Sequence, residues 1–298
     1  MRRRPARPER SRHWTRWARR LGWLLLLLAC LGGIYSWQIE PRWLEIVRIE
    51  LELPHLAPAF DGFKLVQLSD LHIDSGMPPA RLTRIVRLAN REQADVIALT
   101  GDFVTAPNDP AQSTARLTAA LEPLQAQELV AYVLGNHDCE SRPELVQQAL
   151  DAAGIADLNN AVRTLRRDGE SLHMAGLDDI WAGRDRLDRV LAALPVDGAA
   201  ILLFHEPDFA DRSAATGRFD LQLAGHSHGG QVRLPLIGPP FLPPYGREYP
   251  LGRYQFGDTI HYTNRGLGMT ILPIRWRSRP EITVFTLRSP LSRDQDSD

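Results

Sequence analysis

The sequence predicts an α/β protein in which a mostly parallel sheet is covered by helices. Short aliphatic runs alternate with segments of helical period from Lys64 to His205, a pattern typical of parallel sheets with helices on their faces. Three later stretches, 219–233, 258–263 and 281–287, are rich in strand-forming residues. The chain has 298 residues, of which 44% are hydrophobic and 24% charged, so it can bury a substantial core and is not a disordered protein.

The expected elements of the domain follow one another closely. Residues 43–53 alternate apolar and polar side chains, as in a half-exposed strand, and Pro54 ends the run. Apolar residues at helical spacing predict helices over 79–93, 111–127 and 143–153, the last with Ser141 as its N-cap. We expect a domain over 43–288 and a disordered tail over 289–298.

The N-terminus combines a basic tract with an apolar run. Residues 1–20 hold nine Arg and one Glu, a balance of +8, and the net charge of the chain is −1, which leaves −9 for the rest. Residues 21–37 carry no charge, and about 17 residues is the shortest helix that spans a bilayer. We therefore predict a transmembrane signal anchor at 21–37, with 1–20 in the cytoplasm and the domain outside it.

Two alternatives to the anchor stay open, a cleaved signal peptide and a lipoprotein signal that ends at Cys30. The anchor is favoured because apolar residues continue past Cys30 and no clean small-x-small cleavage site is present. The second cysteine, Cys139, lies in a very different setting, so we expect no disulfide between the two.

A long loop is expected at 234–254, where Pro and Gly are too frequent for a regular element. Its tip is apolar and aromatic. Two interpretations stay open: a surface loop that packs on itself, which we favour, and a lip that faces lipid or substrate.

Polar residues follow five of the aliphatic runs, at the point where each predicted strand ends. They are Asp70 and His72, Asp102, Asn136 with His137 and Asp138, His205, and His226 with His228. Carboxyl ends of strands are where polar side chains converge on ligands in layered α/β proteins. Five of the nine histidines fall in these positions, so the sequence predicts one shared site.

Oxygen and imidazole ligands without a thiolate suit Mn, Fe or Zn, and we favour Mn. Seven protein ligands are too many for one such ion, whereas two ions that share an aspartate account for the number. Two ions roughly 3.5–4 Å apart can generate a bridging hydroxide near neutral pH and hold both oxygens of an in-line displacement at phosphorus. The predicted reaction is therefore hydrolysis of a phosphate ester.

The order of these motifs resembles that of the calcineurin-like metallophosphoesterases, from about Gly62 to Leu287. The segments 225–235 and 264–268 are similar to a branch of membrane-anchored bacterial phosphodiesterases in that family. The resemblance implies a four-layer αββα sandwich, in which the strand-rich later half forms a second sheet facing the first.

The resemblance also implies a role for each site residue. Asp70, His72 and His228 would hold one ion, Asn136, His205 and His226 the other, and Asp102 would bridge the two. His137 would donate a proton or hydrogen bond to the leaving oxygen rather than bind metal. The acidic residue that follows Gly-Asp in many relatives is missing here, so Asp138 is the candidate that orients His137.

These inferences predict a dinuclear phosphodiesterase in a bacterial inner membrane, with one span and a periplasmic catalytic domain. Lipid-linked or small-molecule phosphodiesters are the expected substrates, because an anchor raises the local concentration of lipids. The alternatives are a protein or nucleotide phosphatase of the same family and a non-catalytic metal-binding membrane protein. The acidic domain argues against a nucleic-acid partner.

Overall fold

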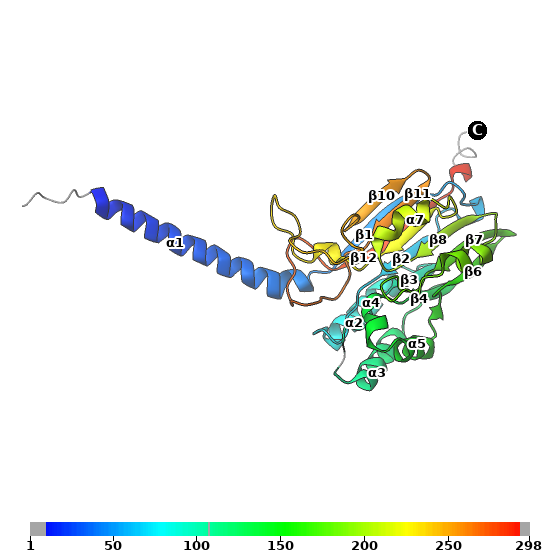
Figure 1. The fold of residues 1–298 in the computed structure, drawn as a ribbon, viewed down its shortest axis with the longest axis horizontal. Coiled ribbons are helices and arrows are strands. Elements are labelled where there is room, and N and C mark those ends of the chain that lie inside the picture. The colour runs from blue at the N-terminus through cyan, green and yellow to red at the C-terminus, as the bar shows by residue number, and fades with distance from the viewer. Residues whose placement is uncertain (1–9, 107, 293–298) are drawn as a thin grey trace, which may run out of the picture.

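Two six-stranded sheets form the body of the molecule in the computed structural model, which describes residues 10–106 and 108–292 (Figure 1). Buried apolar side chains fall into three clusters. One cluster lies between the two sheets, one between the first sheet and its helices, and one between the second sheet and its helices. Three interlayer cores require four layers, so the predicted αββα sandwich is confirmed.

The first sheet carries the early strands of the chain. Its order is β1 (Glu45–Glu52), β12 (Glu281–Arg288), β2 (Lys64–Leu68), β3 (Val96–Thr100), β4 (Leu129–Val133) and β5 (Ala156–Asp157). Strands β2 to β5 are parallel to one another, as predicted, whereas β12 is antiparallel to β2 and parallel to β1.

The position of β12 corrects the expectation that the whole strand-rich later half forms the second sheet. Its side chains alternate between two cores: Ile282 and Val284 face the helices, and Phe285 and Leu287 face the other sheet. A strand buried on both faces has the same sequence pattern in either sheet, so the pattern alone did not assign it.

The second sheet holds the remaining strands. Its order is β10 (Gly252–Phe256), β11 (Thr259–Thr263), β9 (Leu221–Ala224), β8 (Ala199–Leu203), β7 (Glu170–Gly176) and β6 (Ala161–Arg167). The strand predicted over 219–233 ends at Ala224, because backbone angles of φ 67° at His226 and 52° at His228 cannot continue a ladder. Strands β6 and β7 were not predicted from the sequence.

Helices cover the outer face of each sheet. The first sheet packs against α2 (Pro79–Arg91), α3 (Pro110–Leu121) and α5 (Pro143–Ala152), and the second against α6 (Leu187–Ala193). Helix α7 (Ala210–Ala214) contacts the second sheet through a hydrogen bond from the Ser213 hydroxyl to the Gln222 side chain on β9. One-turn α4 (Asn136–Ser141) follows β4, and short 3₁₀ helices occur at Pro58–Phe60, Pro207–Phe209, His228–Gly230 and Pro290–Ser292.

Two helix predictions need correction. Helix α3 ends at Leu121 rather than near 127, because Pro123 has no N–H to donate within a helix and its ring would clash with the carbonyl group four residues earlier. Ser141 is not the N-cap of α5: that position is Arg142, and the Ser141 hydroxyl donates instead to the carbonyl of Thr105 at 2.9 Å.

Helix α1 (Arg10–Ile34) projects away from the sandwich (Figure 1). It continues through a π-helical turn, Tyr35–Ile39, and a 3₁₀ turn, Glu40–Arg42, and the stretch Trp14–Arg42 is long and apolar enough to cross a membrane. A signal sequence near an N-terminus has the same length and composition. Both cysteines are free, as predicted. Residues 1–9 of the basic tract and 293–298 of the predicted tail lie outside the described residues.

Candidate dinuclear metal centre

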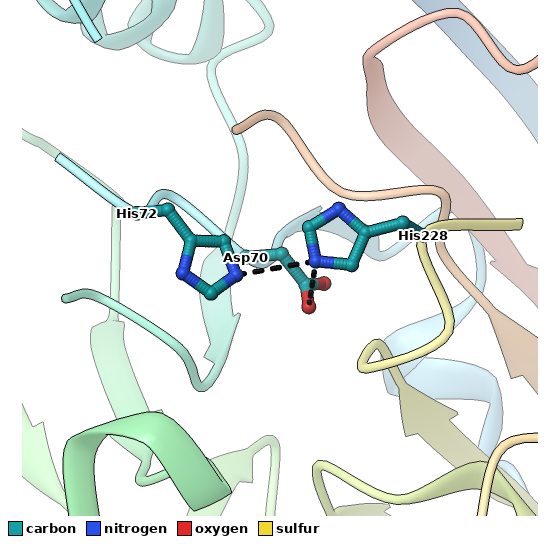
Figure 2. A group of neighbouring side chains, drawn as sticks. All are labelled: Asp70, His72 and His228. Atoms are coloured by element: carbon teal, nitrogen blue, oxygen red, sulfur yellow. Dashed lines mark hydrogen bonds and ion pairs between the residues drawn. The ribbon is translucent and has the colours of Figure 1, made fainter. Parts of the chain in front are cut away.

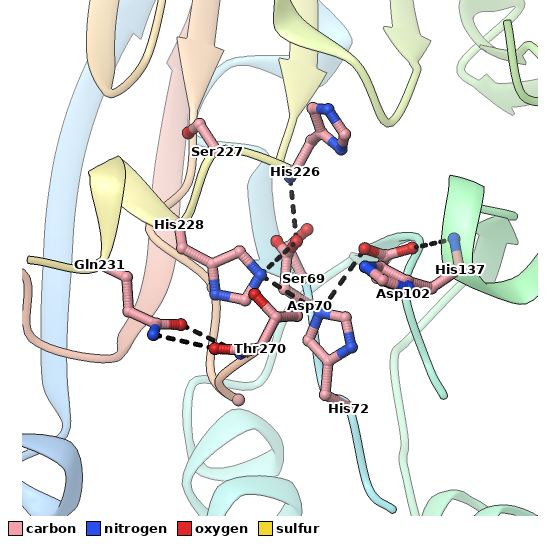
Figure 3. Close-up of polar contacts among 12 residues, drawn as sticks. Ser69, Asp70, His72, Asp102, His137, His226, Ser227, His228, Gln231 and Thr270 are labelled. Carbon is pink, nitrogen blue, oxygen red and sulfur yellow. Dashed lines mark hydrogen bonds and ion pairs between the residues drawn. The ribbon is translucent and has the colours of Figure 1, made fainter. Parts of the chain in front are cut away.

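The predicted site residues come from both sheets. The carboxyl ends of β2, β3 and β4 in the first sheet and of β8 and β9 in the second meet at one end of the sandwich. Figure 3 shows how Asp70, His72, Asp102, His226 and His228 gather there. Two strands of the second sheet therefore complete a site that the first sheet begins.

Sharp backbone turns place the side chains directly after their strands. Asp70, His72, Asp102, His226 and His228 all have left-handed backbone angles, with φ between 43° and 67°. A residue with a β-carbon loses roughly 1–2 kcal/mol in this region. Neighbouring loops fix the conformation: the N–H of Asp70 donates to the carbonyl of Gly101 at 2.9 Å, and that of His72 to Asp102 at 3.0 Å. Backbone strain of this kind is concentrated at functional sites.

Asp70, His72 and His228 form the first group of potential ligands, all buried (Figure 2). Nε2 of His228 lies 3.3 Å from Oδ1 of Asp70 and 3.1 Å from Nε2 of His72. The three donor atoms lie within 4.8 Å of one another, which is close enough for one cation to contact all of them.

Asp102, His205 and His226 form the second group, which is equally buried. Oδ2 of Asp102 lies 3.1 Å from Nε2 of His205. The same oxygen lies 3.5 Å from Nε2 of His72 in the first group. Asp102 therefore stands between the two groups, where a bridging carboxylate would have to be.

Hydrogen bonds to carbonyl groups fix the tautomers of two histidines. Nδ1 of His205 lies 2.7 Å from the carbonyl oxygen of Thr100, and Nε2 of His226 lies 2.8 Å from that of Pro244. A carbonyl oxygen only accepts, so each of these nitrogens carries the proton. When the ring is neutral, its other nitrogen has a free lone pair that points into the site, which is the form that binds a metal.

Several buried polar atoms at the site have no hydrogen-bond partner among the residues that the structure describes: Oδ2 of Asp70, Oδ1 of Asn136 and Nε2 of His205. Leaving a buried polar atom unsatisfied costs roughly 1–3 kcal/mol. All three atoms carry lone pairs and belong to predicted ligands. The donor set of carboxylate, amide oxygen and imidazole therefore fits divalent metal ions of the kind predicted.

The ionisation of the site also fits a bound cation. Burial lowers the pKa of His72 to about 3 and that of His226 to about 4, which keeps both rings neutral, as metal ligands must be. Burial also raises the pKa of Asp70 to about 6. Burial alone would lower the pKa of His205, but the adjacent Asp102 carboxylate outweighs it and holds that pKa well above the ordinary value. A proton on His205 thus compensates Asp102 in the absence of a metal.

Asp138 does not orient His137. Its buried carboxylate accepts hydrogen bonds from four backbone N–H groups, those of Asp102 at 2.8 Å, Phe103 at 2.9 Å, and Val104 and Gly135 at 3.0 Å. The carboxylate therefore holds the loop after β3 against the start of α4, and with it the backbone of Asp102. The expectation of a direct contact with the His137 ring is wrong because all of these bonds go to main-chain groups.

His137 lies on α4 at the edge of both groups. Its backbone N–H donates to Oδ1 of Asp102 at 3.0 Å, and its ring meets the His72 ring edge-on at 5.2 Å between centroids (Figure 3). Two cavities meet at His137 and Glu140, one of about 690 Å³ and one of about 620 Å³. His137 thus faces both cavities, where a substrate can bind.

Arg275 is completely buried beside the site, and its role was not predicted from the sequence. Its guanidinium donates to the carbonyl oxygens of Arg265, Gly266, Gly268 and Ser278 at 2.6–3.2 Å. It thereby shapes the 265–268 loop, in which the N–H of Gly268 donates to the carbonyl of Asp70. Arginine is frequent throughout this sequence, so nothing in the sequence marked Arg275 as a residue that supports the site.

The chain belongs to the calcineurin-like phosphoesterase family, since the model of that family matches residues 63–230. It is 38% identical over 262 residues to the metallophosphoesterase YkuE of Bacillus subtilis (strain 168), covering 87% of this chain and 91% of YkuE. It is 32% identical over 262 residues to the phosphodiesterase YaeI of Escherichia coli (strain K12), covering 86% of this chain and 93% of YaeI. The predicted family is confirmed, and the chain is a metal-dependent phosphoesterase.

Proposed function

We propose that this enzyme is a membrane-anchored phosphodiesterase with two metal ions, manganese by preference. The observation that carries the proposal is the convergence of two buried Asp/His groups that share Asp102 beside the cavities at His137. The name of YaeI, a phosphodiesterase that aligns over 86% of this chain, supports the same reaction.

The geometry supports an assignment of the ligands. Asp70, His72 and His228 would hold one ion, and Asn136, His205 and His226 the other, with Asp102 shared. When bound, the two ions supply a hydroxide near neutral pH and stabilise the charge that develops at phosphorus. His137 stands outside both groups with its ring at the cavity, so it holds the proton that the leaving oxygen requires.

The two cavities support a diester with unlike substituents. The larger cavity is walled by apolar side chains, including Phe241, Ile271 and Leu272. The other is lined by polar groups, including Asn108, Glu140 and Arg142. A phosphate centred near His137 can place an apolar group on one side and a polar group on the other, which is the chemistry of a lipid-linked phosphodiester.

The exposed apolar helix α1 supports membrane attachment, with 21–37 in the bilayer and the catalytic domain over 43–288. The basic residues before the span favour a periplasmic domain in a bacterial inner membrane. Attachment brings a lipid substrate and the site to the same surface.

The test uses the full chain in detergent, loaded with Mn²⁺. We expect two metal ions per chain by elemental analysis, and faster hydrolysis of bis-p-nitrophenyl phosphate than of p-nitrophenyl phosphate. His137→Gln should lower kcat on the diester by roughly 10²-fold or more and leave the metal content unchanged, because His137 binds no ion.

His55→Gln is the matched control, since His55 contacts Asp220 just before β9, at the opposite end of that strand from the site. This variant should retain wild-type kcat. A chain that binds two ions but hydrolyses neither ester would contradict the proposal and favour a non-catalytic metal-binding protein.

A further inference from the structure

Six exposed apolar residues form a surface that we call the apolar rim: Leu234, Leu236, Ile237, Phe241, Ile271 and Leu272. They belong to two loops, the one that follows β9 and the one that precedes β12. Leu236 is fully exposed and Ile271 is 83% exposed. The tip of the first loop therefore does not pack on itself, contrary to the interpretation favoured from sequence. An exposed apolar patch of this kind marks an interaction site.

Hydrogen bonds join the two loops into one surface. The Gln231 side chain donates from Nε2 to the carbonyl oxygens of Thr270 and Leu272, and its Oε1 accepts from the N–H of Thr270 at 3.0 Å (Figure 3). The N–H of Arg233 donates to the carbonyl of Trp276 at 2.8 Å. The two loops of the apolar rim are thus held together by hydrogen bonds.

The rim is also continuous with the end of the apolar helix. The Trp276 ring meets Tyr35 edge-on at 5.5 Å between centroids, and the N–H of Arg275 donates to the carbonyl of Ser36 at 2.8 Å. Figure 1 shows both loops at the end of the domain where α1 arrives. A membrane that contains α1 would therefore meet this end of the domain first.

Side chains typical of a membrane interface surround the base of the helix. Trp37 and the exposed Arg42 and Arg84 line one cavity, and Tyr35 and the exposed Arg277 line another. Aromatic rings favour the headgroup region, and arginines attract anionic lipid headgroups.

We propose that the apolar rim inserts into the headgroup region of the bilayer that α1 crosses, so that the larger cavity opens toward lipid. Phe241, Ile271 and Leu272 belong to both the rim and the cavity wall, and the metal centre lies at the inner end of that cavity. A lipid phosphodiester can then reach the site from the membrane plane with its acyl chains still in the bilayer. The bilayer contact rests on the membrane attachment in the proposed function, and the route rests on its lipid substrate as well.

The test measures membrane depth in the full chain, reconstituted in nanodiscs of phosphatidylethanolamine and phosphatidylglycerol. A nitroxide is attached to one cysteine, Ile237→Cys or Ile271→Cys, in a background with Cys30→Ser and Cys139→Ser. Collisions with oxygen report lipid, and collisions with a nickel chelate report water. The ratio of oxygen to nickel collisions should be about tenfold higher at both positions than in water, as for side chains buried in the interface.

Val196→Cys is the matched control, because Val196 is 83% exposed, the same as Ile271, but precedes β8 at the opposite end of the sandwich. It should give the ratio of a residue in water. A ratio equal to that of Val196 at either rim position overturns the proposal. Hydrolysis of bis-p-nitrophenyl phosphate is measured on the same samples: without it the proposed function fails, but the depth result still decides the bilayer contact.

Discussion

The Asp138 carboxylate accepts a hydrogen bond from the backbone N–H of Asp102 at 2.8 Å, so one acidic residue holds the main chain of another. The same carboxylate accepts hydrogen bonds from three further backbone N–H groups, so each of its two oxygens accepts two. The two residues are therefore one structural unit, in which Asp138 fixes where Asp102 can place its own carboxylate.

Asp138→Asn tests this unit. An amide has one accepting oxygen, so two of the four N–H groups lose their partner, and the free energy of unfolding should fall by about 3 kcal/mol. Metal content should fall as well, because Asp102 loses its position. Asp109→Asn is the control, since the Asp109 side chain accepts a hydrogen bond from the Gln112 N–H at the start of α3, where Asn caps equally well. Chemical denaturation and elemental analysis of both variants check the prediction.

Gly225→Ala should abolish diester hydrolysis. A β-carbon at Gly225 would overlap Oγ of Ser69 and Oδ2 of Asp70, so the Asp70 carboxylate would have to leave the first ligand group. We expect a loss of roughly 10²-fold or more in kcat, as for a misplaced group at a reacting centre. The control is Gly154→Ala: its φ of 76° makes alanine strained, but a β-carbon there meets nothing within 4 Å. If both variants keep wild-type kcat, Asp70 does not need its observed position.

The strand ends that carry Asp70, Asp102, Asn136, His205 and His226 could be predicted because each follows a run of aliphatic residues that is buried in any layered fold. Local pattern was sufficient there. The local residue pattern was not sufficient to place β12 in a sheet. A strand buried on both faces has the same sequence pattern in either sheet, so its sequence does not indicate which strands it pairs with.

The supporting residues of the site could not be predicted for a different reason. Asp138 acts on main-chain groups of residues 102–104, and Arg275 acts on three carbonyl oxygens of the 265–268 loop and on that of Ser278. Bonds from a side chain to distant backbone depend on tertiary structure and leave no spacing in the sequence. The left-handed backbone at His72 and His228 could not be predicted either, because it too depends on tertiary contacts.

Arg275→Gln should uncouple the 265–268 loop from the site. The shorter side chain leaves buried carbonyl groups without donors, so the free energy of unfolding should fall by several kcal/mol, about 3 or more. Bound metal should decrease because the loop contacts Asp70 through Gly268. Arg277→Gln is the control, because Arg277 is exposed near the same turn. Equal metal content and equal stability in the two variants would contradict a positioning role for Arg275.

His261 gives a prediction on pH and stability that does not involve the metal. Burial lowers the pKa of His261 to about 3, below its ordinary value of 6.5, and within the described part of the chain its buried Nδ1 atom has no hydrogen-bond partner. Below pH 6.5 the unfolded chain binds a proton here that the folded chain does not, so the stability that this ring contributes at neutral pH is lost as the pH falls toward 3. The loss is about 1.4 kcal/mol per pH unit.

In metal-free protein, wild type should therefore lose stability between pH 6 and 4 more steeply than His261→Gln, by about 1.4 kcal/mol per pH unit. Guanidinium denaturation at several pH values measures both curves, and pH 7.5, where both states are neutral at this position, gives the packing cost of the substitution alone. Parallel curves would show that the folded protein protonates His261 as readily as the unfolded chain.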